Sequence, residues 1–321
     1  MPDEPRLLFL LGAARSGTKL LRDLLNNHRQ VAFFPVETYF LPDLYARYQD
    51  ADLADRAVFH RFYEEFAKSV FAHNMRSLGL PVLSEDAWFA ATPDRRIAEV
   101  FYRFYAVSYA ESGQALAYFG DKTPRYTNHL PLLARLFPDA RFLHLVRDPR
   151  ERALSERSVW NKSLRKSVSN WVRSVSTVRA FLQSHPGSVL EVRYEDLLEN
   201  PAGTLGRILE YLDLPAQEDL VSLEQSSERY GAARGQTGVM QTNTEKFRNA
   251  LSLATIRRLE EIAFPFLPVY HYPVSYASRE RPLPKWEGKL HGLRDKVSKA
   301  AFCVREMGPA RGWSYFRSLN R

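Results

Sequence analysis

The stretch LLFLLGAARSGTKLLRDLL, residues 7–25, sets the architecture expected of this chain. Its first part, Leu7–Leu11, is a short apolar run that ends at a glycine, which is typical of a buried parallel strand. After the loop, leucines recur at helical spacing as far as Leu25. Within the loop, Gly12 and Gly17 have the separation of the two glycines in a triphosphate-binding P-loop. The stretch therefore predicts a strand, an anion-binding loop and a helix.

The loop departs from the triphosphate pattern at its end. Thr18 stands where that pattern has lysine, and Lys19 is followed by Leu20 instead of the hydroxyl that binds Mg²⁺. Backbone N–H groups and a helix N-terminus still favour an anion there, and Arg15 and Ser16 add a charge and a hydroxyl. This composition favours a phosphate ligand held without a metal. Taken by itself, the loop also fits a strand–turn–helix in which the glycines serve only the turn.

Apolar runs that alternate with helical patterns extend the prediction to the rest of the chain. Further strands are expected over residues 31–34, 117–120, 140–146 and 188–197, and helices over 127–136, 200–215 and 252–267. Residues 41–115 have helical patterning with many aromatic side chains, which indicates a helical insertion after the second strand. We expect an α/β fold with a P-loop-like central parallel sheet flanked by helices. The main domain is expected over residues 1–278, and a basic helical tail over 279–321.

The composition is that of an ordinary globular protein, with 45% hydrophobic and 26% charged residues among 321. The sequence contains no run of 18 or more apolar residues, so we expect no transmembrane helix. The N-terminus lacks the pattern of a secretory signal. The only cysteine, Cys303, forms no intramolecular disulfide, which fits a reducing compartment such as the cytoplasm. The net charge is +8, and residues 279–321 hold 11 Lys/Arg against 4 Asp/Glu. The positive excess thus belongs to the tail, and we expect no nucleic-acid partner.

A second basic loop lies in the stretch FLHLVRDPRERALSE. An apolar strand places Arg147 at its carboxyl end, where ligands bind in open α/β sheets, and Ser155 follows eight residues later. Their guanidinium and hydroxyl donors suit a second phosphate. The alternative is a surface pair of Arg147 with Asp148 and a solvated helix face. One ligand with two separated phosphate groups explains both basic loops.

Five motifs stand in the order GAARSGTKLL, PVETYF, DKTP, VRDPRERALS and RYEDL. With these motifs the chain resembles the sulfotransferases over about residues 7–265. It is most similar to the bacterial branch with a Pro-Glu-Thr-His-Phe-like motif, and its core also resembles the tyrosylprotein sulfotransferase branch. The resemblance implies metal-independent sulfuryl transfer from 3′-phosphoadenosine-5′-phosphosulfate to an acceptor hydroxyl, with release of adenosine 3′,5′-bisphosphate. Carbohydrate, lipid, peptide tyrosine and small molecules stay open as acceptors.

The resemblance also implies a donor site. The residues that match the loop for the 5′-phosphosulfate are Arg15, Ser16, Gly17, Thr18 and Lys19. Lys19 departs from the family, which usually has a second threonine there; it either contacts the sulfuryl oxygens or points into solvent. Arg147 and Ser155 match the 3′-phosphate site, and Tyr194 matches a position near the adenine. The stretch QTNTEKFRN resembles the family's late donor-binding loop, where the candidates are Thr242, Lys246 and Arg248.

In-line sulfuryl transfer needs a base for the acceptor proton and cations for the charge that grows on the bridging oxygen. By the resemblance, Glu37 in PVETYF is the base. Lys122 in DKTP stabilises the leaving group, and Arg15 shares this role. Judged from the residues alone, Glu37 also fits a first helical turn, and Lys122 fits a surface turn beside Asp121.

The tail carries an apolar stripe with the spacing of an amphipathic helix: Leu290, Leu293, Val297, Ala300, Val304 and Met307. Basic residues surround this stripe, and Trp286 and Trp313 flank it. We expect the stripe to pack on the body or on a second subunit, so an oligomer is compatible with it. The alternative is attachment at a membrane surface, which would make the enzyme a peripheral protein with a membrane-borne acceptor.

Two other function classes stay open at this point. A P-loop kinase or NTPase requires Mg²⁺ and a carboxylate that ends a strand, whereas FLHLVRD places Arg147 before Asp148. A non-catalytic, membrane-associated nucleotide-binding scaffold fits the first loop and the tail.

Overall fold

The computed structural model describes residues 4–110, 115–223, 227, 228, 230, 238, 239 and 244–319. Across these residues a five-stranded sheet forms with the order β2-β3-β1-β4-β5, and every pair of neighbours is parallel. The strands are β1 (Arg6–Leu11), β2 (Val31–Phe33), β3 (Tyr118–Asp121), β4 (Arg141–Val146) and β5 (Val189–Arg193). The predicted P-loop-like α/β fold is confirmed.

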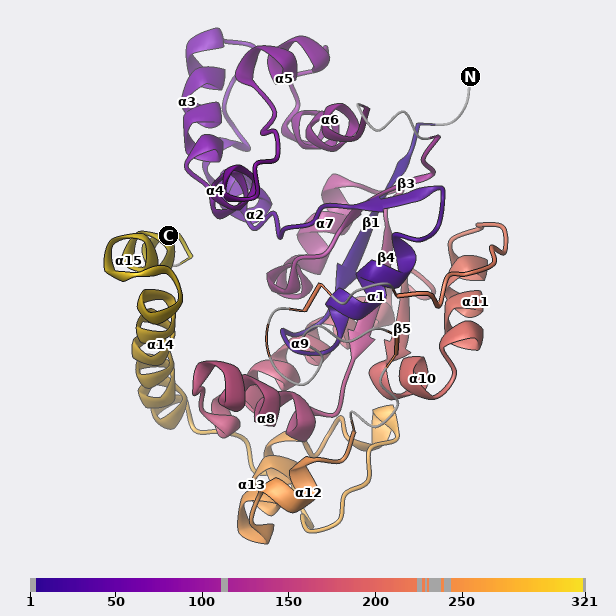
Figure 1. Ribbon diagram of the computed structural model, residues 1–321, viewed down its shortest axis with the longest axis vertical. Coiled ribbons are helices and arrows are strands. Elements are labelled where there is room, and N and C mark those ends of the chain that lie inside the picture. The colour runs from indigo at the N-terminus through magenta and orange to yellow at the C-terminus, as the bar shows by residue number, and fades with distance from the viewer. Residues whose placement is uncertain are drawn as a thin grey trace.

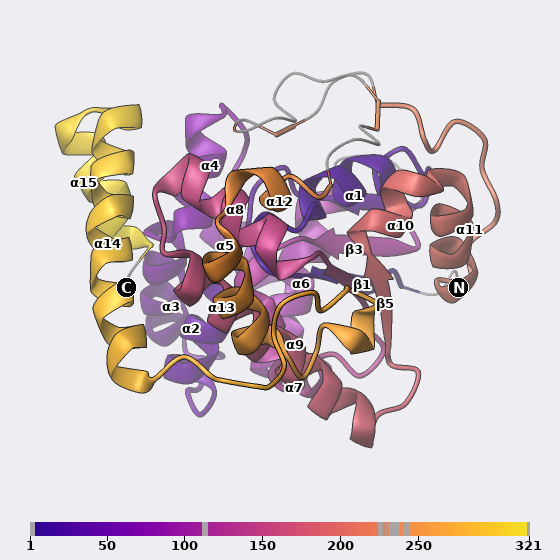
Figure 2. The ribbon, with the colours of Figure 1, turned by 90° about the horizontal axis from the view of Figure 1, so that it is seen from below.

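Helices cover both faces of the sheet (Figures 1 and 2). They are α1 (Thr18–Leu25), α7 (Leu130–Leu136), α8 (Pro149–Trp160), α9 (Leu164–Ser184), α10 (Tyr194–Glu199), α11 (Pro201–Tyr211), α12 (Phe247–Ala250) and α13 (Leu253–Ala263). Two 3₁₀ helices span Pro124–His129 and Pro268–Tyr270. Side chains of β1 alternate between the faces: Leu8 and Leu10 pack with α1, α10 and α11, whereas Phe9 packs with α7 and the insertion.

The last strand is shorter than its sequence pattern predicts. Residues 194–197 were expected to continue the strand, but they open α10. Glu195 and Asp196 lie in the first turn of this helix, where carboxylates interact favourably with the positive end of the helix dipole. The early turn takes Tyr194 off the sheet and over the loop that follows β1.

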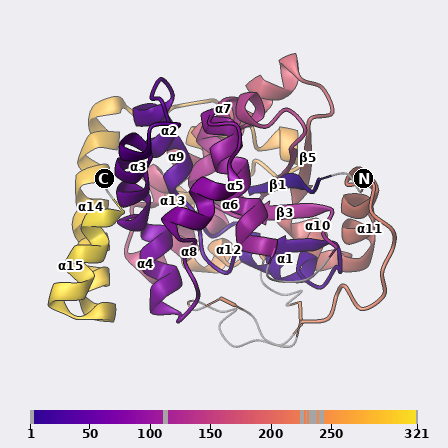
Figure 3. The same cartoon turned by 90° about the horizontal axis from the view of Figure 1, so that it is seen from above.

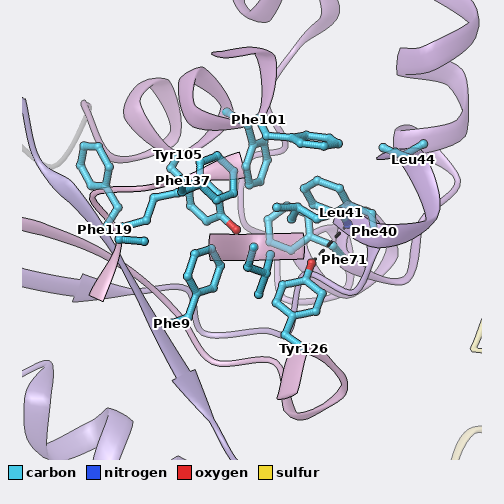
Figure 4. Packing of buried hydrophobic residues seen from close by; sticks show 14 of the residues in the cluster. Phe9, Phe40, Leu41, Leu44, Phe71, Phe101, Tyr105, Phe119, Tyr126 and Phe137 are labelled. Carbon is cyan, nitrogen blue, oxygen red and sulfur yellow. Dashed lines mark hydrogen bonds between the residues drawn. The ribbon is translucent and has the colours of Figure 1, made fainter. Parts of the chain in front are cut away.

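The insertion consists of α2 (Phe40–Tyr48), α3 (Arg56–Ala67), α4 (Val70–Ser77), α5 (Glu85–Ala91) and α6 (Ile97–Ala110). An aromatic core joins it to the sheet (Figure 4). Phe40 contacts the rings of Phe66, Phe71 and Phe104, with centroids 5.0–5.8 Å apart. Because these rings are buried against one another, they anchor the insertion and leave β2 and β3 to present the polar residues that follow them.

The tail forms α14 (Lys285–Met307) and α15 (Pro309–Ser318), which lie along one outer edge of the molecule beside α3 and α4 (Figures 1 and 3). Asp295 on α14 accepts a hydrogen bond from the backbone N–H of Ser163 at 2.8 Å. Arg165 on α9 pairs with Glu287 at 2.6 Å. These contacts place the polar face of α14, and not its apolar stripe, against the body. In the part of the chain that the structure describes, no helix is both long and apolar enough to span a bilayer.

Candidate active site

Four loops meet at the carboxyl edge of the sheet, where parallel strands deliver the residues that follow them. β1 leads into Gly12–Gly17 and β2 leads to Glu37. β3 is followed at once by Lys122, and β4 by Arg147. The sheet order places β1 between β3 and β4, so the loop after β1 lies between the loops that follow β3 and β4.

The first loop has a backbone that only glycine accommodates at its two ends. Gly17 has φ +92°, and a Cβ there would fall 2.3 Å from the ring of Tyr194. Gly12 has φ +149°, and a Cβ there would fall 2.7 Å from the carbonyl oxygen of Leu145. The N–H of Gly12 donates to the Oγ1 of Thr127 at 2.9 Å. The loop is thus packed tightly between β4 and Tyr194.

Ser16 is the residue in this loop that points to a ligand. Its side chain is 0% exposed, and its Oγ has no hydrogen-bond partner among the residues that the structure describes. Buried hydroxyls are normally paired. Gly17, the residue before α1, has no side chain with which to cap the first helical turn, so the N–H groups of that turn are open to an anion. A phosphate or sulfate oxygen at this point would satisfy both.

The structure brings Arg15 of the first loop into contact with both predicted residues of the second loop. The Nε of Arg15 donates to the Oγ of Ser155 at 3.1 Å, and the Nη1 of Arg147 donates to the backbone oxygen of Arg15 at 3.3 Å. The guanidinium of Arg147 also lies 4.5 Å from the ring centre of Tyr194. Arg152 donates to the backbone oxygen of Ala14 at 3.0 Å. The second loop therefore supports the first one directly.

Glu228 is a site residue that the sequence pattern did not reveal. Its Oε1 lies 2.8 Å from the Nη1 of Arg15 and 3.6 Å from the Nζ of Lys19. Burial raises the pKa of Glu228, but the two cations outweigh this and hold the pKa below its usual value. Burial lowers the pKa of Lys19, and Glu228 opposes that effect. Lys19 therefore points toward the site. No sequence motif surrounds Glu228, and only the fold brings it to the loop.

Glu37 and Lys122 form the second group of the site. The buried Nζ of Lys122 donates to one carboxylate oxygen of Glu37, and the hydroxyl of Tyr39 donates to the other. β3 neighbours β1 in the sheet, so Lys122, which follows β3 directly, lies at the same edge as the first loop. Tyr39 has φ +59°, a left-handed conformation that is rare for a bulky residue and is typical of functional sites.

The neighbouring residues in the two motifs hold this pair in place. Asp121 is buried and accepts hydrogen bonds from the hydroxyls of Thr38 at 2.7 Å and Tyr105 at 2.6 Å. The N–H of Thr38 donates to the Oγ1 of Thr123 at 3.0 Å. Burial raises the pKa of Asp121, although these hydrogen bonds oppose the rise. The PVET and DKT segments are thus connected by hydrogen bonds between successive residues, and these bonds hold Glu37 in contact with Lys122.

The late loop lies partly outside the described residues. Thr242 is outside them, whereas Lys246 is exposed at the start of α12. Burial raises the pKa of Glu151, and the charge of Lys246 opposes this rise. Glu151 is 3.5 Å from Arg147, so Lys246 lies near the second loop. Arg248 is exposed and pairs with Glu245 at 3.2 Å.

The tail also comes close to the first loop, which its sequence did not indicate: Phe302 on α14 packs against the ring of Tyr230 at 5.3 Å, and the backbone oxygen of Tyr230 accepts a hydrogen bond from Arg15 at 2.9 Å. Burial lowers the pKa of Lys299 on α14, and the charge of Glu37 opposes this change. Burial raises the pKa of Tyr315 on α15, and the negative charge of Glu37 raises this pKa further. The ring of Tyr315 lies 5.9 Å from that of His73 on α4. The two tail helices therefore border the space between the site and the insertion.

Comparisons with known proteins identify the family of this chain. A family model described as the sulfotransferase family matches residues 5–219. A putative protein-tyrosine sulfotransferase of Caenorhabditis briggsae is 23% identical over 84% of this chain and 90% of its own length. Another, of Caenorhabditis elegans, is 27% identical over 48% of this chain, and the match spans 65% of that relative.

The fold has a solved counterpart. The sulfotransferase domain from the Synechococcus PCC 7002 olefin synthase superposes with a TM-score of 0.54 at 22% identity, covering 85% of this chain and 98% of that domain. The match of the family model extends over more than half of the chain and includes the four loops that meet at the carboxyl edge of the sheet. This chain belongs to the sulfotransferase family.

Proposed function

We propose that this sulfotransferase moves a sulfuryl group from 3′-phosphoadenosine-5′-phosphosulfate to a hydroxyl acceptor, with Glu37 as the base. The observation that carries the proposal is the contact between Glu37 and the buried Lys122, beside a loop whose buried Ser16 hydroxyl is unpartnered among the described residues. An anion site next to a carboxylate–ammonium pair is the arrangement that transfer of a charged group to a hydroxyl requires.

The chain's own residues divide the work. Ser16, the N–H groups at the start of α1 and Lys19 hold the phosphosulfate end of the donor, and Arg147, Ser155 and Lys246 hold the 3′-phosphate end. Tyr194 lies between the two loops, where it supports Gly17 and stacks on Arg147. Arg15 bridges the two loops and adds a cation to the leaving-group side.

Lys122 and Glu37 are coupled. In the structure the Nζ of Lys122 donates to one carboxylate oxygen of Glu37, so that oxygen is occupied before the donor binds. When Lys122 donates instead to the bridging oxygen of the donor, that carboxylate oxygen of Glu37 is released to accept from the acceptor hydroxyl, while the other oxygen keeps the hydrogen bond from Tyr39. The pair thus links occupation of the donor site to activation of the acceptor.

The kinase alternative lacks a free carboxylate at the end of β4. Asp148 is the first residue there that offers one, and its side chain accepts from the backbone N–H of Arg150 at 2.8 Å and pairs with the Arg150 guanidinium at 2.6 Å. It caps α8 and neutralises a buried arginine. This structural use favours the sulfotransferase proposal over a Walker-type site.

Two measurements test the proposal. Titration calorimetry compares adenosine 3′,5′-bisphosphate with ATP–Mg²⁺, and we expect binding of the bisphosphate. A screen with sulfur-labelled donor then offers sugars, lipids with free hydroxyls, phenols and tyrosine peptides; the last are included because the nematode relatives carry the name protein-tyrosine sulfotransferase.

With the best acceptor, Glu37→Gln should lower the transfer rate about 100-fold or more, since a general base contributes roughly that factor. Binding of the bisphosphate should persist. Glu210→Gln, at an exposed position of α11, is the matched control and should transfer normally. Binding of ATP–Mg²⁺ without the bisphosphate would overturn the donor assignment, and full transfer by Glu37→Gln would remove Glu37 as the base.

A further inference from the structure

The apolar stripe of the tail faces away from the protein. Four residues of α14 are largely exposed: Trp286 (69%), Leu290 (61%), Leu293 (64%) and Val297 (65%). At 100° per residue these four lie within one narrow sector of the helix; Val304 lies in the same sector but is half-buried. On α15, Trp313 is 49% exposed. An isolated exposed leucine is ordinary, but a continuous exposed row that begins with a tryptophan is not.

The opposite face of α14 holds the helix in place. Gly288 is buried on this face, and Asp295 caps the chain before α9 through the N–H of Ser163. The ring of Phe302 packs against Tyr230 at 5.3 Å. Asp295 lies about 180° around the helix from Trp286. The stripe is therefore presented outward by a helix whose other side is fixed, and α14 forms an outer edge of the molecule in every ribbon view (Figures 1, 2 and 3).

Charge identifies the surface that this stripe fits. The side chains that border it on α14 are basic on both sides: Lys285, Lys289 and Lys296 along one side, and Arg294 and Arg305 along the other. The acidic residues of α14 are paired or turned toward the body, one of them with an arginine of these rows. Glu287 pairs with Arg165, Asp295 faces the body, and Glu306 pairs with Arg305. The outward face is thus an apolar row with three lysines along one side and two arginines, one of them paired with Glu306, along the other.

We propose that α14 lies flat on an anionic lipid surface, with the stripe in the headgroup region and the basic rows on the lipid phosphates. This is the arrangement of interfacial amphipathic helices, whose tryptophans sit at the headgroup level and whose lysines and arginines extend toward the charged groups. The 23 residues of α14 provide about 34 Å of contact along the surface. A second copy of this chain would bring the same basic rows together, so charge repulsion disfavours it.

Docking would bring the active site to the lipid surface. Phe302, on the body side of the same helix, packs against Tyr230, and the backbone oxygen of Tyr230 accepts a hydrogen bond from Arg15 at 2.9 Å. Only the thickness of one helix, about 10 Å, therefore separates the stripe from the side of α14 that borders the site. The proposal is independent of the donor and of the base, because it concerns the outer face of the helix alone.

Flotation of the full chain with vesicles tests the proposal. With phosphatidylcholine and phosphatidylglycerol at 3:1 we expect the chain to float with the vesicles, and with phosphatidylcholine alone we expect little flotation. The double variant Leu290→Gln with Leu293→Gln should reduce the bound fraction about tenfold or more, since burial of two leucines is lost. Lys289→Gln with Lys296→Gln should weaken binding to the anionic vesicles, and added salt should do the same.

Leu253→Gln is the matched control, because Leu253 on α13 is also 61% exposed but belongs to no stripe. It should float like the unmodified chain, and thermal unfolding should show all variants folded. Absence of flotation with the anionic vesicles, or equal flotation of the stripe variant, would overturn the proposal. A dimer in sedimentation that the stripe variant dissociates, without any vesicle binding, would assign the stripe to a second copy and also overturn it.

Discussion

A single methyl group on Gly17 tests the geometry of the donor loop. In Gly17→Ala the new Cβ would fall 2.3 Å from the ring of Tyr194, and the residue would have to keep φ at +92°. An L-residue in a left-handed conformation costs roughly 1–2 kcal/mol. Pushing the buried Tyr194 ring out of a packed position costs roughly a further 1–3 kcal/mol. Together these give a loss of about 2–5 kcal/mol in the free energy of unfolding.

Urea denaturation measures this loss, and calorimetry with adenosine 3′,5′-bisphosphate should show weaker binding because the loop or Tyr194 has moved. The Tyr194→Ala background separates the two causes. There the same glycine substitution should cost only the backbone contribution, about 1–2 kcal/mol. Gly206→Ala is the control: a Cβ at this position of α11 meets no heavy atom within 4 Å, so the change should stabilise the helix by about 0.5–1 kcal/mol.

The result that refutes the reasoning is a Gly17→Ala protein with unchanged stability and unchanged binding. An equal loss with and without Tyr194 would show that the ring does not confine the loop. In either case the close packing of Tyr194 on the first loop could not explain why a glycine stands at position 17.

Two further predictions concern charges. Glu228→Gln removes the carboxylate that pairs with Arg15 and Lys19, so adenosine 3′,5′-bisphosphate should bind about fivefold tighter in calorimetry; weaker binding would mean that Glu228 serves to position Arg15. Burial raises the pKa of Glu191, but His144, Tyr270 and Arg179 outweigh it and lower the pKa to about 2 from 4.5. Ionised Glu191 therefore contributes about 3 kcal/mol above pH 4.5, and this contribution is lost as the pH falls from about 4.5 to about 2. The difference in unfolding free energy between the unmodified chain and Glu191→Gln should shrink between pH 6 and pH 3, and a constant difference would contradict the assignment.

Much of the site was predictable because its residues follow strands. Glu37, Lys122 and Arg147 each come directly or shortly after a short apolar run, and parallel strands bring such positions to one edge. Tyr194 was expected in the site, but as part of a strand. In the structure it begins α10, whose first turn contains Glu195 and Asp196. The β-forming residues before it gave no sign that the strand ends there. The direction of Lys19 was open in the sequence, and its desolvation and its distance to Glu228 place it at the site.

The sequence by itself determined the α/β architecture, the first loop and the order of the motifs, because these depend on local periodicity and on residues close together in the chain. It also predicted that the tail is an amphipathic helix, but it left open whether the apolar stripe packs on the body, on a second subunit or at a membrane; in the structure Leu290, Leu293 and Val297 do not pack on the body. Only the tertiary structure decided that Glu228 pairs with Arg15 and Lys19 and that the first half of the stripe faces outward. These facts depend on contacts between residues more than 100 positions apart, and local pattern carries no information about which face of a helix meets a distant partner.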